Sequence, residues 1–386
     1  MANIIDYLDW RGDLNFRKAP FNDVDNLILA ELAYTRMEDI VPGPESEETV
    51  SIEKLCEEYE RLEHSVKGNA NNAFLMLAAA AVSERYRNVR VGGYMNIIDP
   101  KQEIQFSACR FFLDDGTEYV AFRGTDATIV GWREDFATTY LTETPGQTAA
   151  VRYLNASAAS SDCSLRVGGH SKGGNLAVYA AAFCEESVQR RILTVYSNDG
   201  PGFSEEIVNS EPFKRIEDRI CDIIPESSMI GILMSDPRER QIIRSTASGI
   251  QQHNPYTWEV LGTKFVKADK QTGTSVFMDE MTDRWLHSLT LEERKNLVNS
   301  VFESIEASGA GTIAELNANP WESYTAIFRA VREMDPDKRK EALQSLARAF
   351  SAGKDTIAGS YDETVQKFMN SIRERFNRIN RKKESE

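Results

Sequence analysis

The chain has 386 residues, of which 41% are hydrophobic and 27% are charged, and its formal net charge is −15. This composition is typical of a globular protein and excludes wholesale disorder. The acidic balance argues against binding to nucleic acid or anionic lipid. The five cysteines lie far apart without a Cys-x-x-Cys pair, so we predict no structural metal and no disulfide framework.

Residues 1–10 carry acids where a signal peptide needs a basic start and an apolar run. The longest apolar stretch, 73–82, is too short to span a membrane. These features and the dispersed cysteines predict a cytoplasmic protein without a transmembrane segment. The basic stretch 373–383 is interpreted as a solvated helix end.

Residues 1–95 are predicted to form a mostly helical region that packs on the core. Asn22 or Asp23 precedes an apolar run and is expected to cap a helix. Two further helices are predicted at 51–64 and 72–86, separated by segments rich in glycine and proline.

Residues 96–270 alternate short β-branched and aromatic runs with helical stretches. This alternation predicts an α/β fold, with a mainly parallel central sheet and helices on both faces. Strands are expected at 104–113, 118–122, 165–169, 192–198, 219–224 and 241–245. Residues 271–386 are predicted to be helical again, as a cap or an appendage, with helices at 289–305, 321–334, 337–350 and 360–379.

Gly169-His170-Ser171-Lys172-Gly173 is a G-x-S-x-G pentapeptide between an apolar β-rich run and an alanine-rich helical run. A serine hydroxyl becomes a useful nucleophile only when a base takes its proton and when it projects from a tight turn. Side chains two residues to either side would clash in such a turn, which accounts for the two glycines. Ser171 is therefore the predicted nucleophile of a strand–turn–helix elbow.

A nucleophile elbow requires two donors for the oxyanion that forms during acyl transfer. The backbone N–H of Lys172 is one candidate, because it follows the nucleophile and begins a helix. Thr125 is the other, through its N–H or its hydroxyl, because it follows an apolar strand ending in Gly124. The segment 125–145 is a candidate lid or substrate wall.

Residues 120–125, followed by Trp132, Asp135 and the Gly-His-Ser-Lys-Gly elbow, resemble the pattern of class 3 lipases. The motifs at 3–8, 10–13 and 198–203 resemble a bacterial family of uncharacterised function that is distantly related to those lipases. The resemblance spans most of the chain and implies an α/β-hydrolase fold. It does not supply a substrate.

The base should be a histidine downstream of the serine, since this fold runs in the order serine, acid, histidine. Among the four histidines, His64 lies upstream, and His170 is inside the elbow with its side chain expected to face away from Ser171. His253 lies in a loop after the last predicted strand, whereas His287 lies within a helical pattern. His253 is therefore preferred.

Two aspartates are candidates for the acid that orients the histidine. Asp199 follows the strand after the elbow helix, and Asp222 lies at the next strand in a D-x-x-P setting similar to that of the class 3 lipase acid. Asp199 is preferred because it belongs to the motif at 198–203, and Asp222 remains the alternative. Ser228, which lies nearby, is expected to be a helix cap.

These residues predict a serine hydrolase that cleaves an acyl ester, as an esterase, lipase or thioesterase does, through an acyl-enzyme and without any cofactor or metal. A small or lipid-like acyl compound is the expected substrate. Two alternatives stay open: a catalytically silent binding or scaffolding protein on the same fold, and a peptidase that cleaves amides. The oligomeric state cannot be read from the sequence.

Overall fold

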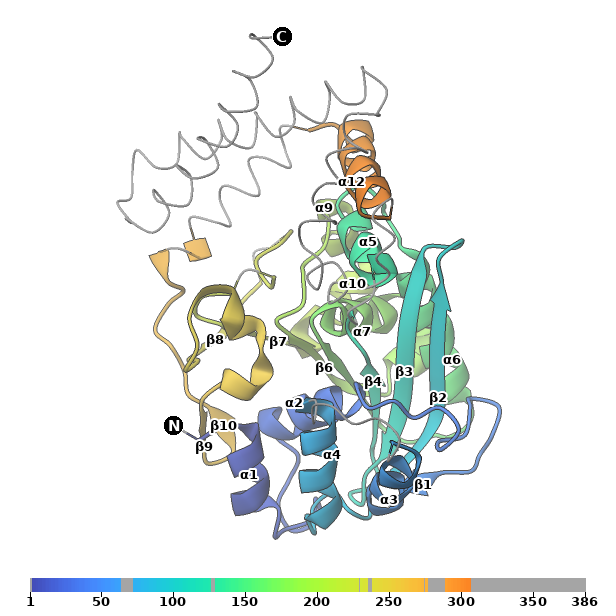
Figure 1. The fold of residues 1–386 in the computed structure, drawn as a ribbon, viewed down its shortest axis with the longest axis vertical. Coiled ribbons are helices and arrows are strands. Elements are labelled where there is room, and N and C mark those ends of the chain that lie inside the picture. The colour runs from blue at the N-terminus through green and yellow to red at the C-terminus, as the bar shows by residue number, and fades with distance from the viewer. Residues whose placement is uncertain are drawn as a thin grey trace.

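The computed structural model describes residues 2–63, 72–125, 129–228, 230–234, 238–273, 275–276 and 289–306. Its centre is an eight-stranded sheet in the order β1 to β8 (Figure 1). The strands are β1 (Val50–Ser51), β2 (Arg90–Asp99), β3 (Ile104–Phe112), β4 (Glu118–Phe122), β5 (Leu165–His170), β6 (Ile192–Asn198), β7 (Ile220–Pro225) and β8 (Gln241–Ile243). Pairs from β1 to β4 are antiparallel, and those from β4 to β8 are parallel.

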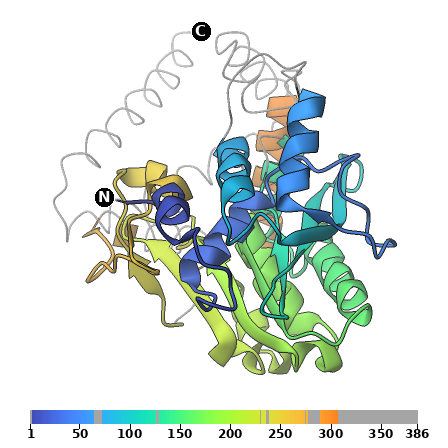
Figure 2. The same ribbon diagram turned by 90° about the horizontal axis from the view of Figure 1, so that it is seen from below.

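Helices cover both faces of this sheet, with the helices of residues 4–82 on one side and those of residues 145–214 on the other (Figure 2). The α-helices are α1 (Ile4–Arg11), α2 (Asp23–Leu32), α3 (Ile52–Glu63), α4 (Asn72–Val82), α5 (Ile129–Ala137), α6 (Pro145–Ala159), α7 (Lys172–Phe183), α8 (Glu186–Gln189), α9 (Glu205–Val208), α10 (Glu211–Lys214) and α12 (Leu291–Glu306). Short 3₁₀ helices are η1 (Glu217–Arg219), η2 (Gly249–His253) and η3 (Pro255–Thr257), and a separate hairpin joins β9 (Val260–Leu261) to β10 (Lys264–Phe265).

Successive residues of β4 show how the sheet is buried on both faces. Tyr119 and Ala121 belong to the apolar cluster formed with the N-terminal helices, whereas Val120 and Phe122 belong to the cluster formed with α6 and α7. Successive side chains of a strand point to opposite faces of the sheet, so a strand that is buried on both faces is a continuous apolar run in the sequence. The predicted α/β-hydrolase fold class is confirmed by this arrangement.

The N-terminal helices are fixed by a buried carboxylate on α2. Asn22 caps α2, since its side chain accepts from two backbone N–H groups of the first turn. Asp25 then receives Arg85 Nε at 2.7 Å and Nη2 at 2.6 Å, Tyr86 Oη at 2.5 Å and Tyr7 Oη at 3.0 Å. The ion pair is fully buried, so its hydrogen bonds must offset a large desolvation cost.

Several element boundaries differ from those predicted. The strand β2 was not predicted: it begins at Arg90, inside the region predicted to be mostly helical, and a bulge interrupts it between Gly92 and Met95. The helix predicted at 72–86 ends at Val82, and the strand predicted at 241–245 ends at Ile243. The short strand β1 had no sequence signal.

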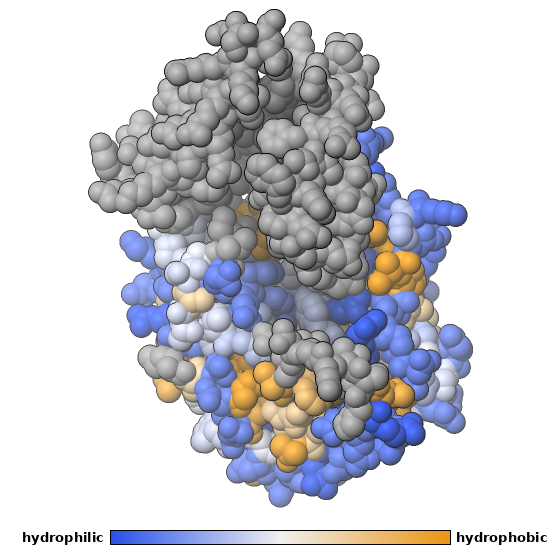
Figure 3. Space-filling view, viewed as in Figure 1, coloured by the Kyte–Doolittle hydropathy of each residue, from blue (hydrophilic) through white to orange (hydrophobic). Residues whose placement is uncertain are grey.

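In the predicted C-terminal helical region, the structure describes α12, which packs against α5 with the rings of Phe302 and Phe136 5.9 Å apart. The helices predicted at 321–334, 337–350 and 360–379 and the basic stretch 373–383 lie outside the described residues. Apolar side chains also gather over α4 on the face seen in Figure 3, where Leu75 and Val82 are exposed. Among the described helices, none has the length and apolar character needed to cross a bilayer.

Candidate active site

Ser171 lies in the predicted elbow between β5 and α7. Its φ of 59° and ψ of −131° lie outside the backbone regions that residues with a side chain prefer. Its N–H donates to the Asn198 carbonyl at 2.9 Å. A Cβ added at Gly169 would lie 2.4 Å from the backbone of Gly173, and one added at Gly173 would lie 2.1 Å from the Phe122 carbonyl oxygen. Both positions of the motif therefore exclude any larger residue.

His253 lies against the serine at the end of η2. Its Nε2 is 3.0 Å from Ser171 Oγ, and its Nδ1 is 2.6 Å from Asp199 Oδ2. A carboxylate only accepts hydrogen bonds, so Nδ1 carries the proton and Nε2 is left to accept from the serine. Of the other histidines, His64 and His287 lie outside the described residues.

Asp199 is a fully buried residue that follows β6 with a left-handed φ of 51°. Its Oδ1 accepts from Ser228 Oγ at 2.5 Å and from the Gly231 N–H at 3.2 Å. Ser228 does accept from Gly231 N–H at 3.0 Å, as a cap would, but the described residues that follow it, 230–234, form turns and no helix. The expectation of a helix cap was therefore wrong, because the hydroxyl hydrogen is directed to Asp199.

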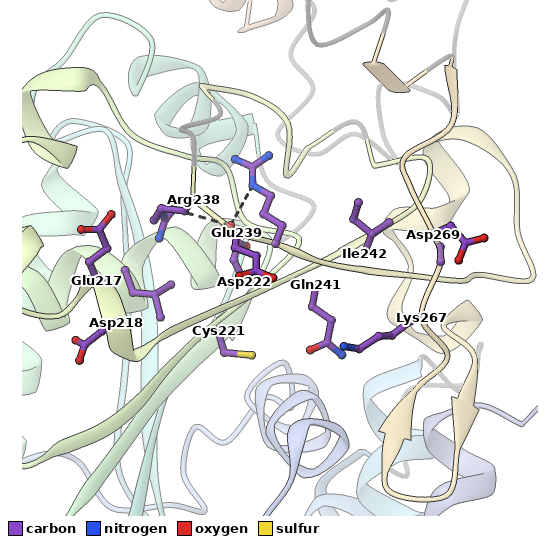
Figure 4. Close-up of a pocket in the computed structure, with 13 residues that line it drawn as sticks. Glu217, Asp218, Cys221, Asp222, Arg238, Glu239, Gln241, Ile242, Lys267 and Asp269 are labelled. Atoms are coloured by element: carbon purple, nitrogen blue, oxygen red, sulfur yellow. Dashed lines mark ion pairs between the residues drawn. The ribbon is translucent and has the colours of Figure 1, made fainter.

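Asp222, the alternative acid, points into a different part of the molecule. Its Oδ2 lies 3.3 Å from Arg240 Nε and 3.8 Å from Arg238 Nη2 (Figure 4). These residues line a cavity of about 590 Å³ beside β7 and β8, which also contains Lys267. The structure thus brings Asp199, and not Asp222, to His253.

The loop that follows β4 lies beside Ser171, where the predicted oxyanion donor is expected. A Cβ added at Gly124 would lie 3.2 Å from Ser171 Cβ. The Thr125 hydroxyl hydrogen-bonds to Asp135 Oδ2, and burial raises the pKa of Asp135 to about 6. Above that pH the ionised carboxylate of Asp135 accepts the hydroxyl hydrogen of Thr125. The backbone N–H of Thr125 is then the group that remains to donate to an oxyanion. The N–H of Lys172 has no acceptor within its own helix because the residue begins α7.

The buried side chain of Lys172 has a role that the motif did not suggest. Its Nζ donates to Gln105 O at 2.8 Å, to Gln105 Oε1 at 2.7 Å and to Glu134 Oε2 at 3.1 Å. Glu134 Oε1 in turn accepts from the Gly146 N–H at 2.6 Å. One ammonium group therefore links β3, α5 and α7 behind the loop of Thr125.

His170 is also closer to the site than the sequence suggested. Its ring centroid lies 4.7 Å from that of His253, and its Nε2 lies 2.9 Å from the His253 carbonyl oxygen. Its Nδ1 lies 3.3 Å from Oε1 of Glu31, a buried residue on α2. Sequence reasoning missed Glu31, because an acid in an apolar helix gives no sign of its distant partner.

The profile of the Mbeg1-like family matches residues 80–303. The chain belongs to the Mbeg1-like family. The matched region contains Ser171, His253 and Asp199, whereas Glu31 lies outside it. A search of curated proteins found no match.

Two solved lipase structures resemble this member of the Mbeg1-like family. M37 lipase is 13% identical, with 53% of this chain and 68% of that chain covered and a TM-score of 0.35. The native propeptide complex of Rhizomucor miehei lipase is 14% identical, with 55% and 77% covered and a TM-score of 0.34. Among the described residues, we find no cluster of three or more His, Cys, Asp or Glu side chains that could hold a metal.

Proposed function

We propose that this protein is a serine hydrolase that cleaves an acyl ester, with Ser171 as nucleophile, His253 as base and Asp199 as the orienting acid. One observation carries the proposal: the continuous chain from Ser171 Oγ to His253 Nε2 at 3.0 Å and from His253 Nδ1 to Asp199 at 2.6 Å. These contacts are within the range of a preorganised nucleophile and base.

The reaction follows from the positions of these groups. Ser171 Oγ attacks the acyl carbon while His253 Nε2 takes its proton, and Asp199 stabilises the resulting imidazolium. The backbone N–H groups of Thr125 and Lys172 hold the oxyanion. His253 returns the proton to the leaving alcohol as the acyl-enzyme forms. Water then attacks that ester with the help of His253, which releases the carboxylic acid and restores Ser171.

A labelling experiment tests the nucleophile directly. A fluorophosphonate probe should label the folded protein at Ser171, and Ser171→Ala should lose both the label and the hydrolysis of short p-nitrophenyl esters. Hydrolysis that persists in Ser171→Ala, or a label on another residue, would refute the assignment. Failure of the folded protein to react at all would favour the silent binding protein.

A lipid-like acyl group is the proposed substrate class. It is supported by apolar side chains on α5 and α12, where Phe136 is 46% and Leu291 is 61% exposed. We expect kcat/KM for p-nitrophenyl esters to rise with acyl chain length, since each buried methylene contributes about 0.8 kcal/mol. Faster cleavage of the matching p-nitroanilides would instead identify a peptidase.

The proposed cellular location is the cytoplasm. It is supported by the five free cysteines, three of which are buried, because dispersed reduced thiols suit a reducing compartment. Fractionation of cells that express the protein, followed by detection with an antibody, tests this proposal. Recovery of the protein from the medium would contradict it.

A further inference from the structure

His170 lies between two hydrogen-bond acceptors. Its Nε2 faces the His253 carbonyl at 2.9 Å, and its Nδ1 faces Glu31 Oε1 at 3.3 Å. A carbonyl oxygen can only accept, so His170 Nε2 must carry a hydrogen, and in a neutral imidazole Nδ1 is then a bare lone pair. That lone pair would repel an ionised Glu31. A second hydrogen is therefore required, held by Glu31, by Nδ1 or by a neighbouring donor such as the Tyr34 hydroxyl.

Burial decides which group holds that hydrogen. The side chains of Glu31 and His170 are each only 8% exposed. Glu31 Oε1 has no formed hydrogen bond among the described groups, and His170 Nδ1 approaches it at an ion-pair distance of 3.3 Å. Burial raises the pKa of Glu31 to about 8. Burial and the neighbouring His253 lower the pKa of His170 to about 3. Near neutral pH, a protonated Glu31 therefore faces a neutral His170.

Other polar and charged groups surround the pair. The hydroxyl of Tyr34, in the turn after α2, lies 3.4 Å from His170 Nδ1, and the Tyr256 hydroxyl on η3 hydrogen-bonds to Glu31. Asp199 acts electrostatically on His170, and the charges of Arg123 and Asp135 act on Tyr34. Of these groups, Tyr34 is the other possible source of a hydrogen for Nδ1.

We propose that Glu31 and His170 form a positioning pair, which shares one proton and holds His253 in place through its backbone carbonyl. The inference rests on the proposed function, since it concerns the base of that site. Removal of the proton leaves one hydrogen for two acceptors. His170 then either turns a lone pair toward Glu31 or changes tautomer and turns one toward the His253 carbonyl. In either case, a lone pair of His170 faces one of the two acceptors, and the contact that holds His253 in place is weakened.

The pH dependence of Ser171 labelling distinguishes this pair from an ordinary structural contact. We expect the rate constant for the fluorophosphonate reaction to fall about tenfold between about pH 7 and pH 9, as a group with a pKa near 8 loses its proton. Glu31→Gln supplies a fixed N–H in place of the protonated carboxyl, so its rate should be level over that range. Tyr34→Phe should keep the fall. A level rate in Tyr34→Phe together with a fall in Glu31→Gln would overturn the inference.

Substitutions of His170 test the link to the His253 carbonyl. His170→Gln carries an amide N–H near the position of Nε2, whereas His170→Leu has similar size without a donor. We expect the leucine variant to lose about tenfold or more in kcat for short esters with little change in KM, since a displaced base costs rate. The glutamine variant should recover most of that loss. Equal rates in the two variants would contradict a role for the donor.

Infrared spectroscopy provides a readout that does not depend on catalysis. The native protein should show the C=O stretch of a protonated buried carboxyl, which titrates near pH 8 and disappears in Glu31→Gln. Absence of that band would refute the shared proton even if Ser171 is labelled. Conversely, a protein that has the band but resists the probe would contradict the proposed hydrolase while the shared proton stands.

Discussion

Asp199 and Asp222 occupy different electrostatic environments, although each lies at a parallel strand of the same sheet. Asp199 is held by Ser228 and Gly231 and reaches His253, whereas Asp222 neutralises Arg238 and Arg240. A carboxylate that orients a base acts on rate, and one that compensates buried cations acts on stability.

Amide substitutions should separate the two roles. Asp199→Asn should lower kcat for short esters by about 10³- to 10⁴-fold, because the imidazole loses its correct tautomer. Asp222→Asn should instead lower the free energy of unfolding by about 3 kcal/mol, because the ion pairs that this largely buried carboxylate forms with Arg238 and Arg240 lose their anion. Ester kinetics and urea denaturation measure the two effects. The reverse pattern would assign Asp222 as the acid.

The hydroxyl of Ser228 offers a finer test of how Asp199 is held. Ser228→Ala removes the donor to Asp199 Oδ1, and a hydrogen bond to a charged group contributes about 1.5–3 kcal/mol. We expect kcat for ester hydrolysis to fall about tenfold. Ser227→Ala is the matched control, since that hydroxyl bonds to Thr272 instead. Equal effects of the two substitutions would show that Ser228 does not position the acid.

For single residues, the sequence was sufficient to propose Ser171 and His253 and to prefer Asp199 as the acid, but it left Asp222 open as the alternative. The elbow has a steric signature in Gly169 and Gly173, and elimination among few histidines leaves a short list. Asp199 and Asp222 each lie at a strand end in a motif that suits the acid, and the contacts that distinguish them come from residues remote in sequence. The proximity of Glu31 to His170 could not be predicted for the same reason.

Among the elements, the crossing of β4 over the start of α7 determines the geometry of the nucleophile. The strands β4, β5 and β6 were predicted almost to the residue, because their apolar runs are continuous and bounded by turns. The strand β2 was missed, because Gly92 and Gly93 interrupt its apolar pattern, and the left-handed φ of Gly93 belongs to the strand's own irregularity.

Gly173→Ala should therefore break the elbow. The added Cβ would meet the Phe122 carbonyl oxygen at 2.1 Å, and a backbone atom cannot rotate away. We expect a loss of at least about 3 kcal/mol in the free energy of unfolding, at the upper end of overpacking costs, measured by urea denaturation. Gly273→Ala is the control, since a Cβ there meets nothing within 4 Å. A Gly173→Ala variant as stable as the control would contradict the tight crossing.

For the whole molecule, the opposite pKa shifts of Glu31 and His170 give a particular dependence of stability on pH. Between about pH 4.5 and 6.5, folding moves one proton from His170 to Glu31 without net uptake, so the contribution of the pair is level. From 6.5 to about 8 the native state binds the extra proton, and stability falls as pH rises. Below 4.5, down to about 3, the unfolded state binds the extra proton, and stability falls as pH drops.

The double variant Glu31→Gln/His170→Gln should lack both slopes. The difference in the free energy of unfolding between native protein and variant should therefore be level between about pH 4.5 and 6.5. It should decline on either side by up to about 1.4 kcal/mol per pH unit. Urea denaturation across this pH range measures the difference. A difference that changes steadily through the middle of the range would contradict the paired shifts.

The antiparallel bridge between Ala2 and Val260 joins the start of α1 to the segment just after His253. This bridge joins two parts of the chain that are very far apart in sequence. Such contacts form slowly, because a very long loop must close before they can form. During synthesis, α1 and α2 emerge well before the segment that covers them. The parts of these helices that contact η3 and β10 therefore stay uncovered until that segment arrives, and His253 can meet Ser171 only after it.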